Sequence, residues 1–100
     1  MSDAPVMDNP RTSPSTTPPK VDRLPPFHLV LHNDDVNDMG HVVDALTSVT
    51  PVRQSDAQKI MITAHFRGWA IVMTTHRERA ELYRDRLRSK ALVATVEPAE

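Results

Sequence analysis

Five of the six residues from 33 to 38 carry an amide or a carboxylate, and this cluster limits the fold more than any other feature of the sequence. Asn and Asp side chains compete with the backbone for hydrogen bonds, which favours turns and helix starts over the interiors of strands and helices. The cluster therefore separates an apolar strand, predicted over residues 27–32, from a helix that begins near Met39. Asn37 or Asp38 is the predicted N-cap of that helix.

Two helices are predicted after the cluster. The first follows from the helical spacing of its apolar residues before Pro51, namely Met39, Val42, Val43, Leu46 and Val49. The second is predicted to start with a capping box, in which Ser55 is followed three residues later by Gln58. Gly68 suits the left-handed position just past its end.

The remaining sequence predicts a strand, a helix and a last strand. Residues 69–74 form the second strand, Thr75 and Glu78 form another capping box for the third helix, and residues 91–96 form the third strand. The order is β-α-α-β-α-β. The predicted fold class is therefore α+β, a small sandwich in which helices pack on one face of a three-stranded antiparallel sheet.

The first part of the chain differs in composition from the rest. Seven of the nine prolines lie within residues 1–26, and residues 1–23 are rich in Pro, Ser and Thr with little to bury. Such a segment buries too little apolar surface to offset the conformational entropy that it would lose on folding. We expect residues 1–23 to be a disordered extension and residues 24–100 to be one folded domain.

Composition narrows the functional classes. The chain has no cysteine, and its net charge of −1 provides no basic surface for nucleic acid. No apolar run approaches the ~20 residues that cross a bilayer. We therefore expect a cytoplasmic monomer that binds neither nucleic acid nor membrane and needs no cofactor.

The polar cluster admits three interpretations. Asn and Asp could simply make the turn and favour the positive end of the helix. Asp34 and Asp35 could bind a metal with one of the five histidines and support a hydrolase, although no HExxH spacing is present. Alternatively, carboxylates and an amide could bind an ammonium group through charge-assisted hydrogen bonds, beside an apolar pocket that includes the adaptable side chain of Met39.

Several motifs together resemble the ClpS family, adaptors that bring N-degron substrates to a Clp AAA+ unfoldase and its protease. These are "NDD" after an apolar strand, a helix with Met39 and Val42, the run "IMITAHFRGWAI", and the ending "LRSKALVATVEP". The likeness extends from about Pro26 to Pro98. The short stretch before the last strand is more similar to cyanobacterial and plant members than to the longer proteobacterial type.

The resemblance implies roles for individual residues. Asn33, Asp34 and His65 would bind the substrate α-amino group, and Asp35 would support the loop. The hydrophobic pocket would be lined by Met39, Val42, Met61, Ala64 and Leu92, and its rim would be formed by Asn37 and Asp38. Met39 would also exclude β-branched first residues.

The resemblance also implies partners. Family members bind proteins that begin with Phe, Trp, Tyr or Leu and deliver them to a ClpA- or ClpC-type unfoldase, so the chain itself would not be an enzyme. Ala64 stands where a Val is frequent, which predicts a larger pocket and relatively better binding of aromatic residues than of Leu. The rival interpretations are a protein–protein interaction domain of the same fold without N-degron binding and the metal-dependent hydrolase.

Overall fold

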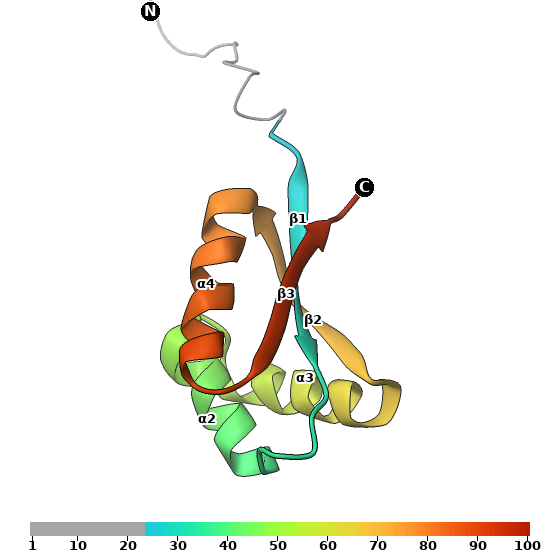
Figure 1. The fold of residues 1–100 in the computed structure, drawn as a ribbon, viewed down its shortest axis with the longest axis vertical. Coiled ribbons are helices and arrows are strands. Elements are labelled where there is room, and N and C mark those ends of the chain that lie inside the picture. The colour runs from blue at the N-terminus through green and yellow to red at the C-terminus, as the bar shows by residue number, and fades with distance from the viewer. Residues whose placement is uncertain (1–23) are drawn as a thin grey trace, which may run out of the picture.

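The computed structural model describes residues 24–100, and the predicted disordered extension lies outside these residues. The elements follow the predicted order β-α-α-β-α-β (Figure 1). The predicted α+β class, with three helices against a three-stranded antiparallel sheet, is confirmed. Within the described residues, the helices are too short or too polar to cross a bilayer.

The three strands pair with β1 at the centre. β1 (Pro26–His32) lies between β2 (Trp69–His76) and β3 (Val93–Pro98), and both neighbours are antiparallel to it. Leu29 pairs with Met73 and Val30 with Ile71, which leaves Val72 as an extra residue in β2. Ala70 and Val72 face the core by strand alternation, and the bulge shifts the alternation so that the next residue, Met73, also packs against the core.

The helix after the polar cluster begins where the sequence predicts. α2 (Met39–Val49) has Asp38 as its N-cap, and the Asp38 carboxylate accepts a hydrogen bond from the His41 N–H at 2.8 Å. This confirms one of the two predicted caps. The carboxylate satisfies a backbone donor that the helix itself leaves without a partner.

The second helix confirms its predicted end but not its predicted start. α3 (Gln54–Arg67) begins one residue before Ser55, and its N-cap is Arg53, which makes no side-chain hydrogen bond to the helix. The Ser55 capping box is therefore wrong, because Ser55 already lies inside the helix. Gly68 ends α3 in the left-handed conformation, with φ of 96°, as predicted.

The third helix and the last strand both start later than the sequence predicts. Thr75 still pairs with Phe27 in the sheet, so β2 reaches His76, and the His76 ring caps α4 (Arg77–Ser89) by accepting from the Arg79 N–H. Ala91 has a φ of 69° and belongs to a turn. β3 consequently starts at Val93 and continues to Pro98, two residues beyond the predicted end.

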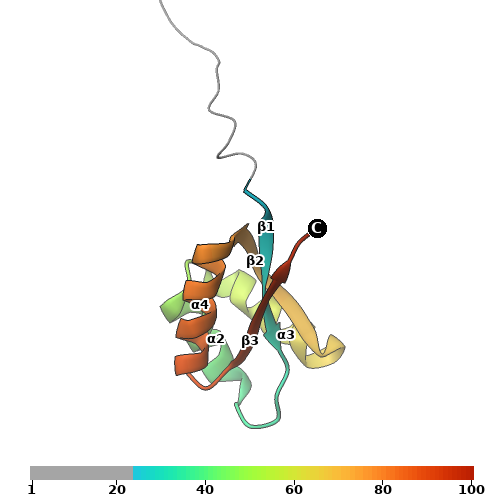
Figure 2. The same cartoon turned by 45° about the horizontal axis from the view of Figure 1, so that its top comes forward.

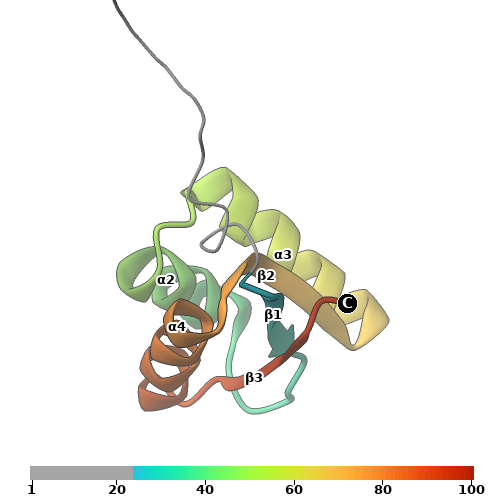
Figure 3. The ribbon, with the colours of Figure 1, turned by 90° about the horizontal axis from the view of Figure 1, so that it is seen from above.

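All three helices lie on one side of the sheet, as predicted. α3 packs against β2, α4 packs across the sheet, and α2 packs against both helices (Figures 2 and 3). Leu29, Leu31, Leu46 and Leu87 are buried in the resulting single core. Because α2 sits beyond the end of β1, the polar loop that joins them bends around one end of the sheet.

The two glycines offer a test of the fold, since only Gly68 has a backbone that requires glycine. A Cβ at Gly68 would meet no atom within 4 Å, so Gly68→Ala should lower the free energy of unfolding by about 1 to 2 kcal/mol through backbone strain alone. Gly40 is helical, and Gly40→Ala should raise the same quantity by up to about 1 kcal/mol. Urea unfolding of both variants measures the difference, and shifts of equal sign and size would contradict this assignment.

Candidate functional site

A cavity of about 340 Å³ opens between the polar loop, α2 and α3. Its polar wall consists of loop residues and one histidine of α3, namely Asn33, Asp34, Asp35, Asn37, Asp38 and His65. Its apolar wall consists of Leu31, Met39, Val42, Met61 and Ala64. The structure therefore brings together all but one of the predicted site residues at one hollow.

The exception is Leu92, which the resemblance placed in the pocket. Leu92 is 3% exposed, lies in the hydrophobic core and does not line the cavity. It directly precedes β3 and belongs to the cluster of buried core residues. In its place, Leu31 and His32 at the end of β1 contribute to the lining, a role that the sequence analysis did not predict.

The Asp34 carboxylate organises the loop. Its Oδ1 accepts hydrogen bonds from the backbone N–H groups of Val36 at 2.9 Å and Asn37 at 2.8 Å. The Asn37 side chain donates to both Asp34 oxygens, at 3.3 Å to Oδ1 and 3.2 Å to Oδ2. From residues 24–100, Oδ2 therefore accepts a single hydrogen bond, and that bond is long. Within residues 24–100, Asp34 accepts these four hydrogen bonds, whereas Asp35 accepts none from a side chain or backbone group.

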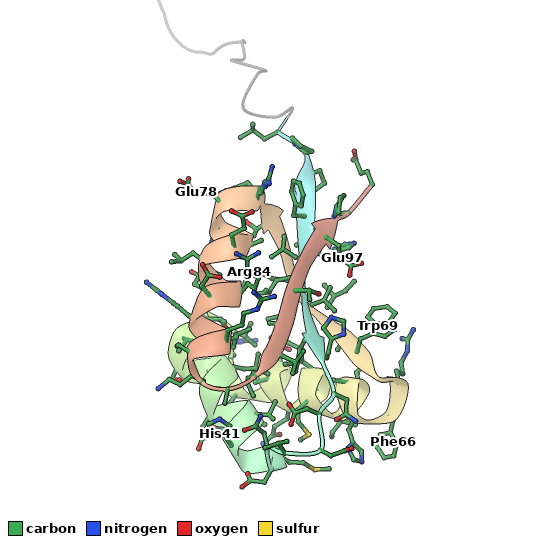
Figure 4. All side chains as sticks on the ribbon, viewed as in Figure 1. His41, Phe66, Trp69, Glu78, Arg84 and Glu97 are labelled. Atoms are coloured by element: carbon green, nitrogen blue, oxygen red, sulfur yellow. The ribbon has the colours of Figure 1, made fainter. Side chains whose placement is uncertain are left out.

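Three further hydrogen bonds fix the loop and the start of α2 to neighbouring turns. The Asn33 N–H donates to the Gly68 carbonyl at 2.9 Å, and Asn37 Nδ2 donates to the Ala91 carbonyl at 2.8 Å. His41 Nε2 lies 2.7 Å from the Lys90 carbonyl, on the side of α2 that faces the end of α4 (Figure 4). Because a carbonyl only accepts, this nitrogen carries a proton and donates it.

Charge at the loop is maintained by these contacts. Burial alone would raise the pKa of Asp34. The pKa is nevertheless lowered from its ordinary value of 3.8, because the carboxylate accepts hydrogen bonds from the Asn37 backbone and side chain and from the Val36 backbone, and because His41 lies nearby. Asp34 is therefore an anion at neutral pH. It stands beside Asp35 and Asp38 in a loop that contains no cationic side chain.

His65 completes the polar wall from the opposite side of the cavity. It lies near the end of α3, where its ring packs edge-on against Phe66 with the ring centres 5.0 Å apart. Phe66 is 80% exposed and points away from the body of the protein (Figure 4). Among residues 24–100, no three His, Asp or Glu side chains converge as metal ligands do.

The apolar wall is formed mainly by two helices. Val42 projects from α2, and Met61 and Ala64 project from α3 one turn apart, so both lie on the same face. Ala64 is 2% exposed and forms part of the floor. Met39 is 48% exposed at the mouth, where its flexible side chain can adjust to what enters.

Comparison with known proteins identifies relatives for most of the chain. Residues 22–95 match the family model described as ATP-dependent Clp protease adaptor protein ClpS. The chain is 38% identical over 79 residues to a Synechococcus ClpS adapter, covering 78% of this chain and 76% of that protein. It is 39% identical over 75 residues to the chloroplastic CLPS1 of Arabidopsis thaliana, covering 74% of this chain and 47% of that protein.

A solved structure also resembles the fold. Agrobacterium tumefaciens ClpS2 bound to L-phenylalaninamide superimposes with a TM-score of 0.71 at 28% identity, covering 76% of this chain and 99% of that chain. The relatives in both comparisons are named as adaptors or as ClpS proteins, not as enzymes. The similarity to cyanobacterial and chloroplast proteins confirms the predicted cyanobacterial and plant-like type.

The loop geometry predicts different outcomes for its two adjacent carboxylates. Asp34→Ala removes the acceptor of two backbone N–H groups and should lower the free energy of unfolding by about 1 to 2 kcal/mol at pH 7. Asp35→Ala should have little effect. Since the folded state lowers the pKa of Asp34, its contribution is present above pH 3.8 and shrinks as the pH falls further.

Urea unfolding of both variants at pH 7 and pH 3 measures this contrast. Equal destabilisation by the two substitutions, or a cost of Asp34→Ala that grows in acid, would contradict the loop assignment.

Proposed function

The chain belongs to the ClpS family of adaptors of the ATP-dependent Clp protease, and on that basis we propose that it binds the free α-amino group and the bulky hydrophobic first residue of N-degron substrates. The observation that supports this most strongly is the pairing of an anionic loop with an apolar floor in one cavity. The start of such a substrate is complementary to both walls, because its ammonium is cationic and its first side chain is hydrophobic.

The polar wall would bind the amine. A protein α-amino group has a pKa of about 7.7 to 8.0, so it is largely an ammonium at neutral pH with three N–H donors. Asp34 Oδ2 retains acceptor capacity, and Asn33 and His65 line the same cavity. We propose that these three groups accept from the ammonium, with Asp35 adding negative charge at close range. Asp34 would thus hold the loop with one oxygen and the substrate with the other.

The apolar wall would bind the first side chain. Phe, Trp, Tyr or Leu would extend between Val42, Met61 and Ala64, with Asn37 and Asp38 at the rim. Met39 at the mouth would narrow the entrance at the level of the substrate Cβ. A side chain branched at that carbon would meet Met39, whereas Leu and the aromatic residues branch farther along.

The energies are consistent with a moderate affinity. Burial of a Phe side chain contributes about 1.5 to 3 kcal/mol, and each charged hydrogen bond contributes roughly 1.5 to 3 kcal/mol. Association costs about 4 kcal/mol or more. The balance permits a Kd near micromolar, which corresponds to about −8 kcal/mol, only when both walls are occupied.

The adaptor would perform no chemistry itself. We propose that it hands bound substrates to a ClpA- or ClpC-type AAA+ unfoldase, and that hydrolysis takes place in the associated protease. Release would then depend on withdrawal of a single side chain and one ammonium, since the proposed contacts involve only the chain start.

Blocking the substrate amine tests the ammonium contact. N-acetylation of a Phe-initiated peptide removes the charge and two donors, so its Kd should rise at least about 100-fold relative to the free peptide, as measured by fluorescence anisotropy. A free peptide that begins with Ala is the matched control for the apolar wall and should bind at least as poorly. Equal affinities of the free and acetylated Phe peptides would refute the proposal.

The small side chain of Ala64 predicts the order of first residues. Because Ala64 is small, the pocket should be large enough to favour Phe and Trp over Leu. The substitution Ala64→Val should therefore weaken binding of a Trp peptide more than that of a Leu peptide. We expect a selective loss of about 10-fold for Trp from one or two overpacked methyl groups. Tighter binding of Leu than of both aromatic residues by the unmodified protein would contradict the predicted pocket size.

A further inference from the structure

A second cavity of about 320 Å³ lies between α2 and α3. One wall is formed by Gly40, Val43 and Asp44, which are three and four residues apart and therefore share a face of α2. The opposite wall includes Gln58 and Ile62 of α3, which share a face for the same reason. Two facing helices thus enclose a groove that the proposed binding of the first residue does not use.

The α2 wall of the groove includes a glycine in the first turn of the helix. Gly40 has no positive φ, so its backbone does not require glycine, and glycine costs a helix stability relative to alanine. A Cβ at Gly40 would meet only Asp38 Oδ1, at 3.4 Å, within a radius of 4 Å. Packing therefore does not require glycine either. The consequence of the missing side chain is an open cavity wall.

The two cavities share two methionines in their linings. Met39 and Met61 line both of them, so the mouth of the first cavity and the near end of the second share one apolar surface. A substrate whose first side chain occupies the first cavity would leave it across this surface. The next residues of the same chain are therefore the nearest available occupants of the second cavity.

The lining indicates which side chains would fit. Val43, Met61 and Ile62 provide an apolar floor, and Ile62 is 48% exposed. Asp44 stands at the rim and makes no ion pair with any residue of 24–100. An aliphatic stem that ends in a cation would bury its methylenes on the floor and place its charge beside Asp44.

We propose that this cavity is a second subsite, which binds the side chain of the second or third substrate residue and prefers Lys or Arg. The inference rests on the proposed capture of a free chain start in the first cavity. It adds a specificity determinant, Gly40, whose role is to leave room for the substrate instead of contacting it through a side chain.

Three free-amine peptides test the subsite by fluorescence anisotropy with the full chain. They begin Phe-Ala-Ala, Phe-Lys-Ala and Phe-Ala-Lys and are otherwise identical. The better Lys peptide should bind about five-fold more tightly than Phe-Ala-Ala, in line with one partly exposed ion pair and a buried stem. Gly40→Leu, which fills the groove, should reduce this ratio to about one while leaving the affinity for Phe-Ala-Ala unchanged.

Charge variants separate the subsite from general electrostatics. Asp44→Asn should reduce the Lys preference to about two-fold, whereas Asp56→Asn, which removes an equal charge from a part of α3 outside the cavity, should preserve it. A Lys preference below two-fold at both positions, or one that survives Gly40→Leu, overturns the subsite. If Phe-Ala-Ala binds no better than its acetylated form, the first cavity fails and the subsite fails with it. Binding of Phe-Ala-Ala without a Lys preference removes the subsite alone.

Discussion

The acceptance of two backbone N–H groups by Asp34 is the interaction on which the site depends. Adjacent carboxylates repel each other, and a loop that carries three of them needs compensation to stay compact. The N–H groups of Val36 and Asn37 provide it for Asp34, and Asn37 also joins the loop to the Ala91 carbonyl. The loop can therefore remain anionic at neutral pH and still keep a fixed shape. Fixed charge beside an apolar floor is the property that the proposed function uses.

Two methionines contribute to both of the cavities described above. Met39 and Met61 line both cavities, so the two hollows share an apolar surface, and each also has a carboxylate in its lining. In our proposals, the first cavity binds a bulky hydrophobic residue next to an ammonium, and the second binds a long basic side chain. A ClpS-family adaptor with both would read its substrate over several residues. The small number of contacts at each position is compatible with transfer of the substrate to an unfoldase.

Local signals predicted much of the fold. Asp38 caps α2 and Gly68 ends α3, because both depend on neighbouring residues only. Thr75 was wrongly predicted to be a cap. It pairs with Phe27 in the sheet, and a contact between residues so far apart in the sequence leaves no signal in the neighbouring residues. The loop carboxylates of the site were evident as a cluster, whereas His65 entered only through family resemblance. Leu92 was placed in the pocket by the same resemblance, and in this structure it is buried in the core and is not among the residues that line the cavity.

The pKa of the bound substrate amine tests the central claim most directly. A Phe-initiated peptide labelled with ¹⁵N at its α-amino group can be titrated by NMR, free and in complex with the protein. Capture by the anionic loop stabilises the charged form, so the account predicts a pKa in the complex clearly above the free value of about 7.7 to 8.0. A pKa that is unchanged or lowered on binding would contradict the account, because the amine would then be neutral in the site or remote from the carboxylates.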